Sequence, residues 1–111
     1  MSMSTTARTM IFEFKNREQV CRFILMYRDL FVPYAEETIN CKRKMDEKWG
    51  FLGQAREEIN GSYSEGYYVD HDNEGMLFAK MEPWTLKEIL ASGGFKKERI
   101  RRNKFKYVFE G

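Results

Sequence analysis

Apolar positions at helical spacing are concentrated between Asn16 and Val32, the longest apolar run of the chain. Six of them recur three and four positions apart, which places them on one helical face: Val20, Phe23, Ile24, Tyr27, Leu30 and Phe31. Cys21, Leu25 and Met26 widen this face past half of the circumference. We therefore predict a helix that is packed between two layers or keeps part of its surface for a partner.

Both ends of this helix carry sequence signals. Asn16 is a suitable N-cap, because its side-chain oxygen can accept a hydrogen bond from a free backbone amide, and Gln19 can reach back as in a capping box. Pro33 is expected to end the helix, since the residue before a proline is pushed out of helical geometry.

Period-two alternation predicts strands elsewhere in the chain. Residues 9–14 place Met10, Phe12 and Phe14 on one face. Two further strands, YYVDH and MLFAKM, flank the turn DNEG, in which Gly75 is expected to supply a left-handed position. The final stretch KFKYVF is predicted to bury its aromatic side chains and expose its lysines, and the basic run before it lies outside every predicted element.

A short helix is predicted at residues 84–90. Thr85 and Glu88 match the Ser/Thr-x-x-Glu capping box, and Trp84 can pack back on the helix as a hydrophobic staple. The glycine pair at 93–94 should end this helix.

The segment 34–60 is the hardest to assign. Its apolar residues fall near helical spacing, and Gly50 indicates a break between two helical segments. A strand over residues 38–45 is the alternative, because several apolar residues there also fit a period of two.

Together these elements predict an α+β fold, a small antiparallel sheet of about four strands with helices on one face. Without the 34–60 segment, the order β-α-β-β-α-β is that of a ferredoxin-like sandwich carrying a helical insert. Residues 1–8 are expected to form a flexible leader, and residues 9–111 a single domain.

Composition fits one domain with an apolar core. The chain has 111 residues, 42% of them hydrophobic and 15% aromatic, which is enough for a core without disulfides. Cys21 and Cys41 lack metal-ligand spacing and are expected to be buried thiols. The N-terminal stretch lacks a secretory pattern, and no window is apolar enough to span a membrane. We expect a cytoplasmic protein with no membrane contact.

Charge is distributed unevenly. The net charge of +2 divides into about +2 for residues 1–35, −5 for 36–82 and +5 for 83–111. The basic C-terminal stretch holds Lys96, Lys97, Arg99, Arg101, Arg102, Lys104 and Lys106. These cations could neutralise the phosphates of a nucleic acid. The alternative is that they protect an exposed sheet edge against aggregation.

No catalytic signature is present. His71 is the only histidine and lies in a polar turn, away from any nucleophile motif. The string from Asp70 to Gly75 matches the opening of a calcium loop, but Met81 occupies the position of the bidentate glutamate. We therefore expect a non-enzymatic protein with no metal and no cofactor.

Aromatic residues exceed what so small a core can easily hide, and aromatic residues are enriched at protein interfaces. The compact chain without catalytic residues resembles small phage or mobile-element proteins that act by binding a host protein. We predict a module that regulates or inhibits a protein partner, with Tyr27, Phe31, Trp49 and Phe51 at the contact. A homodimer is a further option, and nucleic-acid binding through residues 96–106 is the alternative function.

Overall fold

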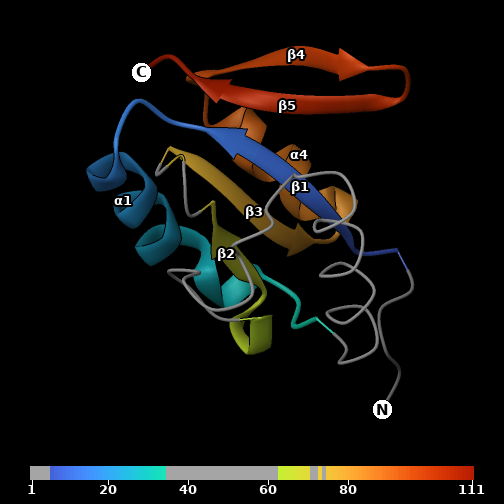
Figure 1. The fold of residues 1–111 in the computed structure, drawn as a ribbon. Coiled ribbons are helices and arrows are strands. Elements are labelled where there is room, and N and C mark those ends of the chain that lie inside the picture. Colours follow the sequence, from blue (N-terminus) through green and yellow to red (C-terminus); the bar gives the residue numbers. More distant parts are fainter. Residues whose placement is uncertain (1–5, 35–62, 71–72, 74) are drawn as a thin grey trace.

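The computed structural model describes residues 6–34, 63–70, 73 and 75–111. These residues form a five-stranded mixed sheet with two α-helices, α1 (Arg17–Tyr27) and α4 (Pro83–Ala91) (Figure 1). The strands are β1 (Arg8–Glu13), β2 (Tyr67–Val69), β3 (Met76–Met81), β4 (Phe95–Arg101) and β5 (Lys104–Phe109). Two 3-10 turns complete the described elements: η1 (Arg28–Leu30) and η2 (Tyr63–Glu65). Residues 34–60 were assigned to helices or a strand from the sequence, and all of these except Tyr34 lie outside the described residues.

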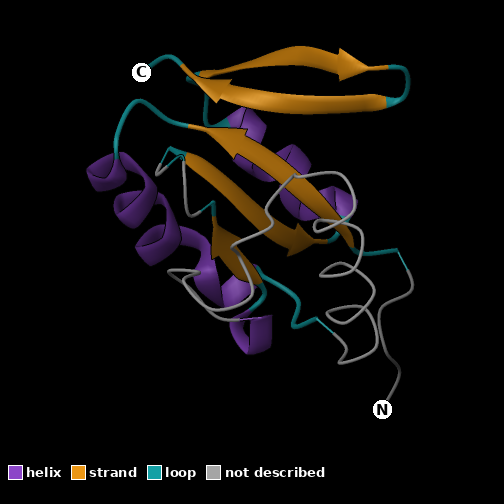
Figure 2. Cartoon of the chain, in the orientation of Figure 1, coloured by secondary structure: helices purple, strands orange, loops and turns teal. Residues whose placement is uncertain are grey.

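The predicted α+β class is confirmed, and the sheet differs from the prediction in size and direction. The strand order is β2-β3-β1-β5-β4, with β5 parallel to β1 and the other neighbours antiparallel. The basic run before KFKYVF, for which the sequence predicts no element, is part of strand β4. Strands β4 and β5 form a hairpin (Figure 2). Strand β5 lies beside β1, and β4 occupies the edge of the sheet. The ferredoxin-like order with four strands is therefore not confirmed.

One face of the sheet packs against both helices. Phe12 on β1 and Phe14 just after it belong to this core, as the alternation over residues 9–14 predicts, and the β2–β3 hairpin contributes Val69, Leu77, Ala79 and Met81. From the helices come Val20, Phe23, Ile24 and Ile89. In the view of Figure 2, α4 passes behind β1. The predicted placement of helices on one face thus holds for the described part of the chain.

The opposite face has a smaller buried cluster. It contains Ile11, Tyr34, Tyr68 and Phe78, all nearly or fully shielded from solvent. The rings of Tyr68 and Phe78 stack at a centroid distance of 4.9 Å with an interplanar angle of 6°. The sheet is therefore buried on both faces around β1 and β3, which fixes the positions of its central strands.

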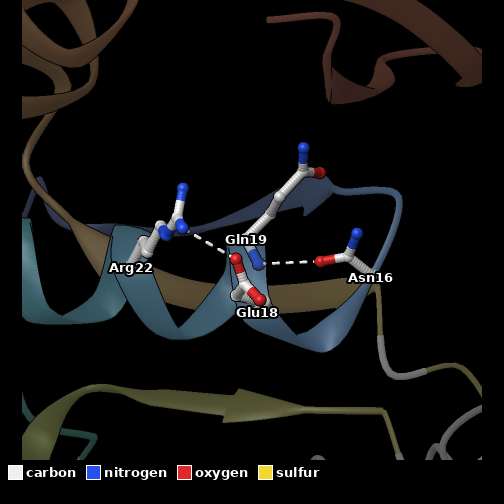
Figure 3. Close-up of polar contacts among 4 residues, drawn as sticks. All are labelled: Asn16, Glu18, Gln19 and Arg22. Carbon is white, nitrogen blue, oxygen red and sulfur yellow. Dashed lines mark hydrogen bonds and ion pairs between the residues drawn. The ribbon is translucent and has the colours of Figure 1, made fainter.

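Helix α1 begins where the sequence predicts. The Asn16 side-chain oxygen accepts a hydrogen bond from the Gln19 backbone N–H at 3.0 Å (Figure 3). The Gln19 side chain reaches back as in a capping box, but it accepts from the backbone N–H of Lys15 at 2.9 Å, one residue before the cap. The far end differs from the prediction, because α1 ends at Tyr27 and continues only as the 3-10 turn η1 before the chain becomes extended at Phe31.

We expect the Asn16→Ala substitution to lower the free energy of unfolding by about 1 kcal/mol, because it leaves an N-terminal amide of α1 without its acceptor. Urea denaturation followed by circular dichroism measures this loss. Asn16→Asp is the matched control, since it keeps an acceptor oxygen and should cost much less. Equal losses for the two variants would mean that the cap does not stabilise α1.

Helix α4 starts earlier than predicted. Its N-cap is Glu82, and Pro83 occupies the first helical position, where a fixed φ angle and a missing N–H are no disadvantage. Thr85 is therefore inside the helix and buried rather than capping it. Trp84 is 63% exposed, so it does not act as the predicted staple. The glycine pair ends the helix as predicted, with both residues in the left-handed region.

The β2–β3 hairpin is confirmed, but the reason for glycine at its turn is different. Gly75 is not among the described residues with positive φ. A Cβ atom there would lie 2.2 Å from the backbone oxygen of Phe14, and the Phe14 N–H donates to the Gly75 carbonyl at 2.7 Å. Glycine is needed because the turn lies directly against the end of β1.

Two burial predictions require correction. Cys21 is exposed, because its position on α1 faces away from the core, and Cys41 lies outside the described residues. In β5 the aromatic side chains are only partly covered, and Phe105 is exposed. Strand β5 lies beside the edge strand β4. Phe105 is near the turn of the β4–β5 hairpin, where few side chains pack against it.

Candidate functional site: an aromatic groove and a basic hairpin

A groove with a volume of about 610 Å³ runs between α1 and the base of the β4–β5 hairpin. We call it the aromatic groove and define it by Phe14, Phe23, Met26, Tyr27, Phe95 and Phe109. Phe23, Met26 and Tyr27 come from α1, and Phe14 follows β1. Phe95 and Phe109 come from the paired ends of β4 and β5. The groove thus joins two regions that are distant in sequence, one around α1 and the other around the last hairpin.

The aromatic rings of the groove support one another. Phe14 has its ring centroid 5.2 Å from that of Phe23, 6.0 Å from that of Phe95 and 5.5 Å from that of Phe109. Phe95 and Phe109 are 5.1 Å apart across the hairpin. Tilted and edge-on pairs at these separations are favourable aromatic contacts. The mutual packing holds the rings in place, so the groove is preformed.

Gly93 and Gly94 line the groove with backbone atoms only. Gly93 and Gly94 follow α4 with φ angles of +87° and +88°, which favour glycine. A Cβ atom at Gly94 would lie 3.0 Å from the Phe109 ring, whereas one at Gly93 would meet nothing within 4 Å. The glycine pair therefore leaves the groove open to a ligand on this side.

Two large apolar side chains of α1 beside the groove are exposed. Leu25 is 72% exposed and Met26 is 70% exposed. Met26 also lines the groove, so the apolar surface continues from the rim into the interior. Single exposed apolar residues are ordinary on proteins, but an exposed apolar rim beside an aromatic groove is typical of a protein contact surface.

Arg22 is the charged side chain among the groove-lining residues that the structure describes. Its guanidinium lies 2.7 Å from a carboxylate oxygen of Glu18, one helical turn earlier (Figure 3). Both side chains are mostly exposed, and exposed ion pairs of this kind are worth little. A carboxylate on a ligand can therefore replace Glu18 at small cost.

The second candidate feature is the β4–β5 hairpin, which carries all seven cations of the predicted basic stretch. The exposed ones are Lys96, Lys97, Arg99, Arg101 and Arg102, while Lys104 and Lys106 are partly covered. The hairpin is joined to β1 by the pairs Phe12↔Tyr107 and Glu13↔Val108. The half of the hairpin nearer to its turn extends beyond this ladder (Figure 1).

Lys106 and Lys97 are held in place by contacts with neighbouring side chains. The Lys106 ammonium forms a partly buried ion pair with Glu13 at 2.7 Å, which ties the hairpin to β1. The Lys97 ammonium lies over the Phe105 ring, 4.2 Å from its centroid. Burial raises the pKa of the Tyr107 phenol, which moves its ionisation further above physiological pH.

The residues predicted at a partner contact fall in different places. Tyr27 is half-buried and lines the aromatic groove. Phe31 is buried in the core, where it packs against Phe23 and Tyr67. Trp49 and Phe51 lie outside the described residues. Of the four, the structure therefore places Tyr27 at the groove.

Several groove residues were not predicted at a protein contact from the sequence. Phe95 and Phe109 enter the groove because β4 and β5 pair in a register that sets them opposite each other. The sequence signal for this register is Asn103, because asparagine favours turns, and its φ of 59° suits the tight turn between the two strands. Met26 was noted only as part of the wide helix face.

Among the described residues, no three or more His, Cys, Asp and Glu side chains gather as they would around a metal ion. No described helix is both long and apolar enough to cross a membrane. Comparison of the chain with protein-family models, with curated proteins and with solved structures found no match.

Proposed function

We propose that the protein is a non-enzymatic binding module that regulates or inhibits a protein partner through the aromatic groove. The observation that carries this proposal is the preformed groove of six aromatic and apolar side chains beside the exposed Leu25 and Met26. Burial of apolar surface drives most protein association, and a preformed site avoids part of the ordering cost.

The chemistry of the groove indicates the kind of segment that it binds. Its apolar lining favours aliphatic or aromatic anchor side chains, as in recognition of an amphipathic segment. Arg22 at the rim favours a carboxylate beside those anchors. The proposed ligand is therefore a segment of a partner protein with apolar anchors and an acidic residue next to them.

The Met26→Glu substitution tests this proposal. Met26 is 70% exposed, so we expect the free energy of unfolding to change by no more than about 0.5 kcal/mol. A carboxylate on the apolar rim should lower affinity for the partner by at least about tenfold. The measurement is affinity capture with tagged protein from nuclease-treated lysate, followed by titration of the purified partner.

Trp84→Glu is the matched control, because Trp84 is also an exposed apolar residue but lies on α4 and does not line the groove. A protein captured by the wild type and by Trp84→Glu, and lost with Met26→Glu, supports the proposal. Capture of the same proteins by all three forms contradicts it. Sedimentation of the purified protein distinguishes a partner protein from a second copy of this chain.

A further inference from the structure

We infer that the β4–β5 hairpin binds duplex DNA, as a function separate from the aromatic groove. The hairpin, residues 95–109, holds seven cationic side chains and the carboxylate of Glu98, a net charge of +6. Because the whole chain carries +2, the other residues together carry −4. A polyanion is therefore attracted to this hairpin and repelled by the rest of the molecule.

The hairpin presents cations on both of its faces. Residues that pair across the ladder share a face, so Lys97 and Arg99 lie on the helix-covered side with their partners Tyr107 and Phe105. A bulge between Arg99 and Arg101 changes this alternation, so that Arg101 pairs with Lys104 on the other side. Lys96 shares that second side. Phosphates on either flank of the hairpin can thus meet a cation.

The shape of this element fits a DNA groove. The major groove of B-form DNA admits a two-stranded β-ribbon. The hairpin is such a ribbon, and its turn, Arg102–Asn103, extends past the β1–β5 ladder (Figure 1). Double-stranded RNA fits less well, because its major groove is deep and narrow.

The aromatic side chains of the hairpin argue against a single strand. Single-stranded nucleic acids bind on exposed aromatic rings that stack with successive bases. Tyr107 and Phe109 pack against the core cluster. Phe105 is 37% exposed, but Lys97 lies over its ring. The hairpin therefore offers charge and shape rather than a stacking platform.

The test measures binding to a short mixed-sequence DNA duplex of about two helical turns, and to one of its single strands, by fluorescence anisotropy between about 50 and 200 mM salt. For the wild type we expect the logarithm of affinity to fall with the logarithm of salt concentration, with a slope of about −4. The Arg101→Ala/Arg102→Ala variant should lower affinity about tenfold at the lower salt concentration and reduce the slope by about 2.

The charge-matched control is Lys15→Ala/Lys87→Ala, which removes two exposed cations outside the hairpin. It should bind duplex DNA as the wild type does, and Arg101→Lys/Arg102→Lys should keep the wild-type slope. If the alanine hairpin variant does not fold, Lys96→Ala/Lys97→Ala replaces it. Absence of binding by the wild type at low salt, equal losses for hairpin and control variants, or tighter binding to the single strand would each overturn the inference.

Discussion

The Phe12→Ala substitution should lower the free energy of unfolding by about 3–5 kcal/mol, which is a large part of the ~5–15 kcal/mol typical of a domain. Phe12 is fully buried in β1. Its ring centroid lies 4.8 Å from that of Phe23 on α1 and within 6 Å of those of Phe95 and Tyr107. Removing the ring leaves a cavity between the helix layer and the hairpin. Urea denaturation followed by circular dichroism measures the loss.

Phe105→Ala is the matched control for this prediction, because it makes the same chemical change at a ring that is 37% exposed. Its ring contacts the Lys97 ammonium rather than the core, and the expected loss is about 1 kcal/mol or less. Similar losses at the two positions would contradict the view that Phe12 joins the helices to the hairpin.

The parts of the fold that could be predicted from sequence are those whose apolar pattern is strong and local. Strand β1, the cap at Asn16 and the β2–β3 hairpin were predicted because alternation, capping and turn chemistry involve neighbouring residues. Strand β4 was not predicted, because its residues from Lys96 to Arg99 are all charged and show no apolar alternation. It is a strand because β5 pairs with it, and this pairing also places β5 parallel to β1.

The groove could be predicted from the sequence only in part. The wide apolar face of α1 predicts either packing between two layers or a part of the helix surface kept for a partner, and the structure shows Leu25 and Met26 exposed. The opposite wall could not be predicted, because Phe95 and Phe109 meet only through the long-range register of the last hairpin. The cations at 96–106 were recognised as a cluster, but their division between two faces depends on the bulge after Arg99.

The Gly66→Ala substitution should lower the free energy of unfolding by about 2–5 kcal/mol, of which about 1–2 kcal/mol comes from the left-handed backbone and the rest from steric overlap. Gly66 has a φ of +87°, and a Cβ atom there would lie 2.7 Å from the Val32 carbonyl oxygen and 2.9 Å from Phe31 Cβ. Backbone hydrogen bonds to Lys80 hold both Gly66 and Val32 in place. The Lys80 N–H donates to the Gly66 carbonyl, and the Val32 N–H donates to the Lys80 carbonyl, each at 2.8 Å.

Gly93→Ala separates these two contributions. Gly93 has the same φ of +87°, but a Cβ atom at that position meets nothing within 4 Å. We therefore expect Gly93→Ala to cost only the conformational part, about 1–2 kcal/mol. The difference between the two variants, measured by urea denaturation, reports how closely the chain after η1 packs against the start of β2. Equal costs would show that this contact does not hold the two segments together.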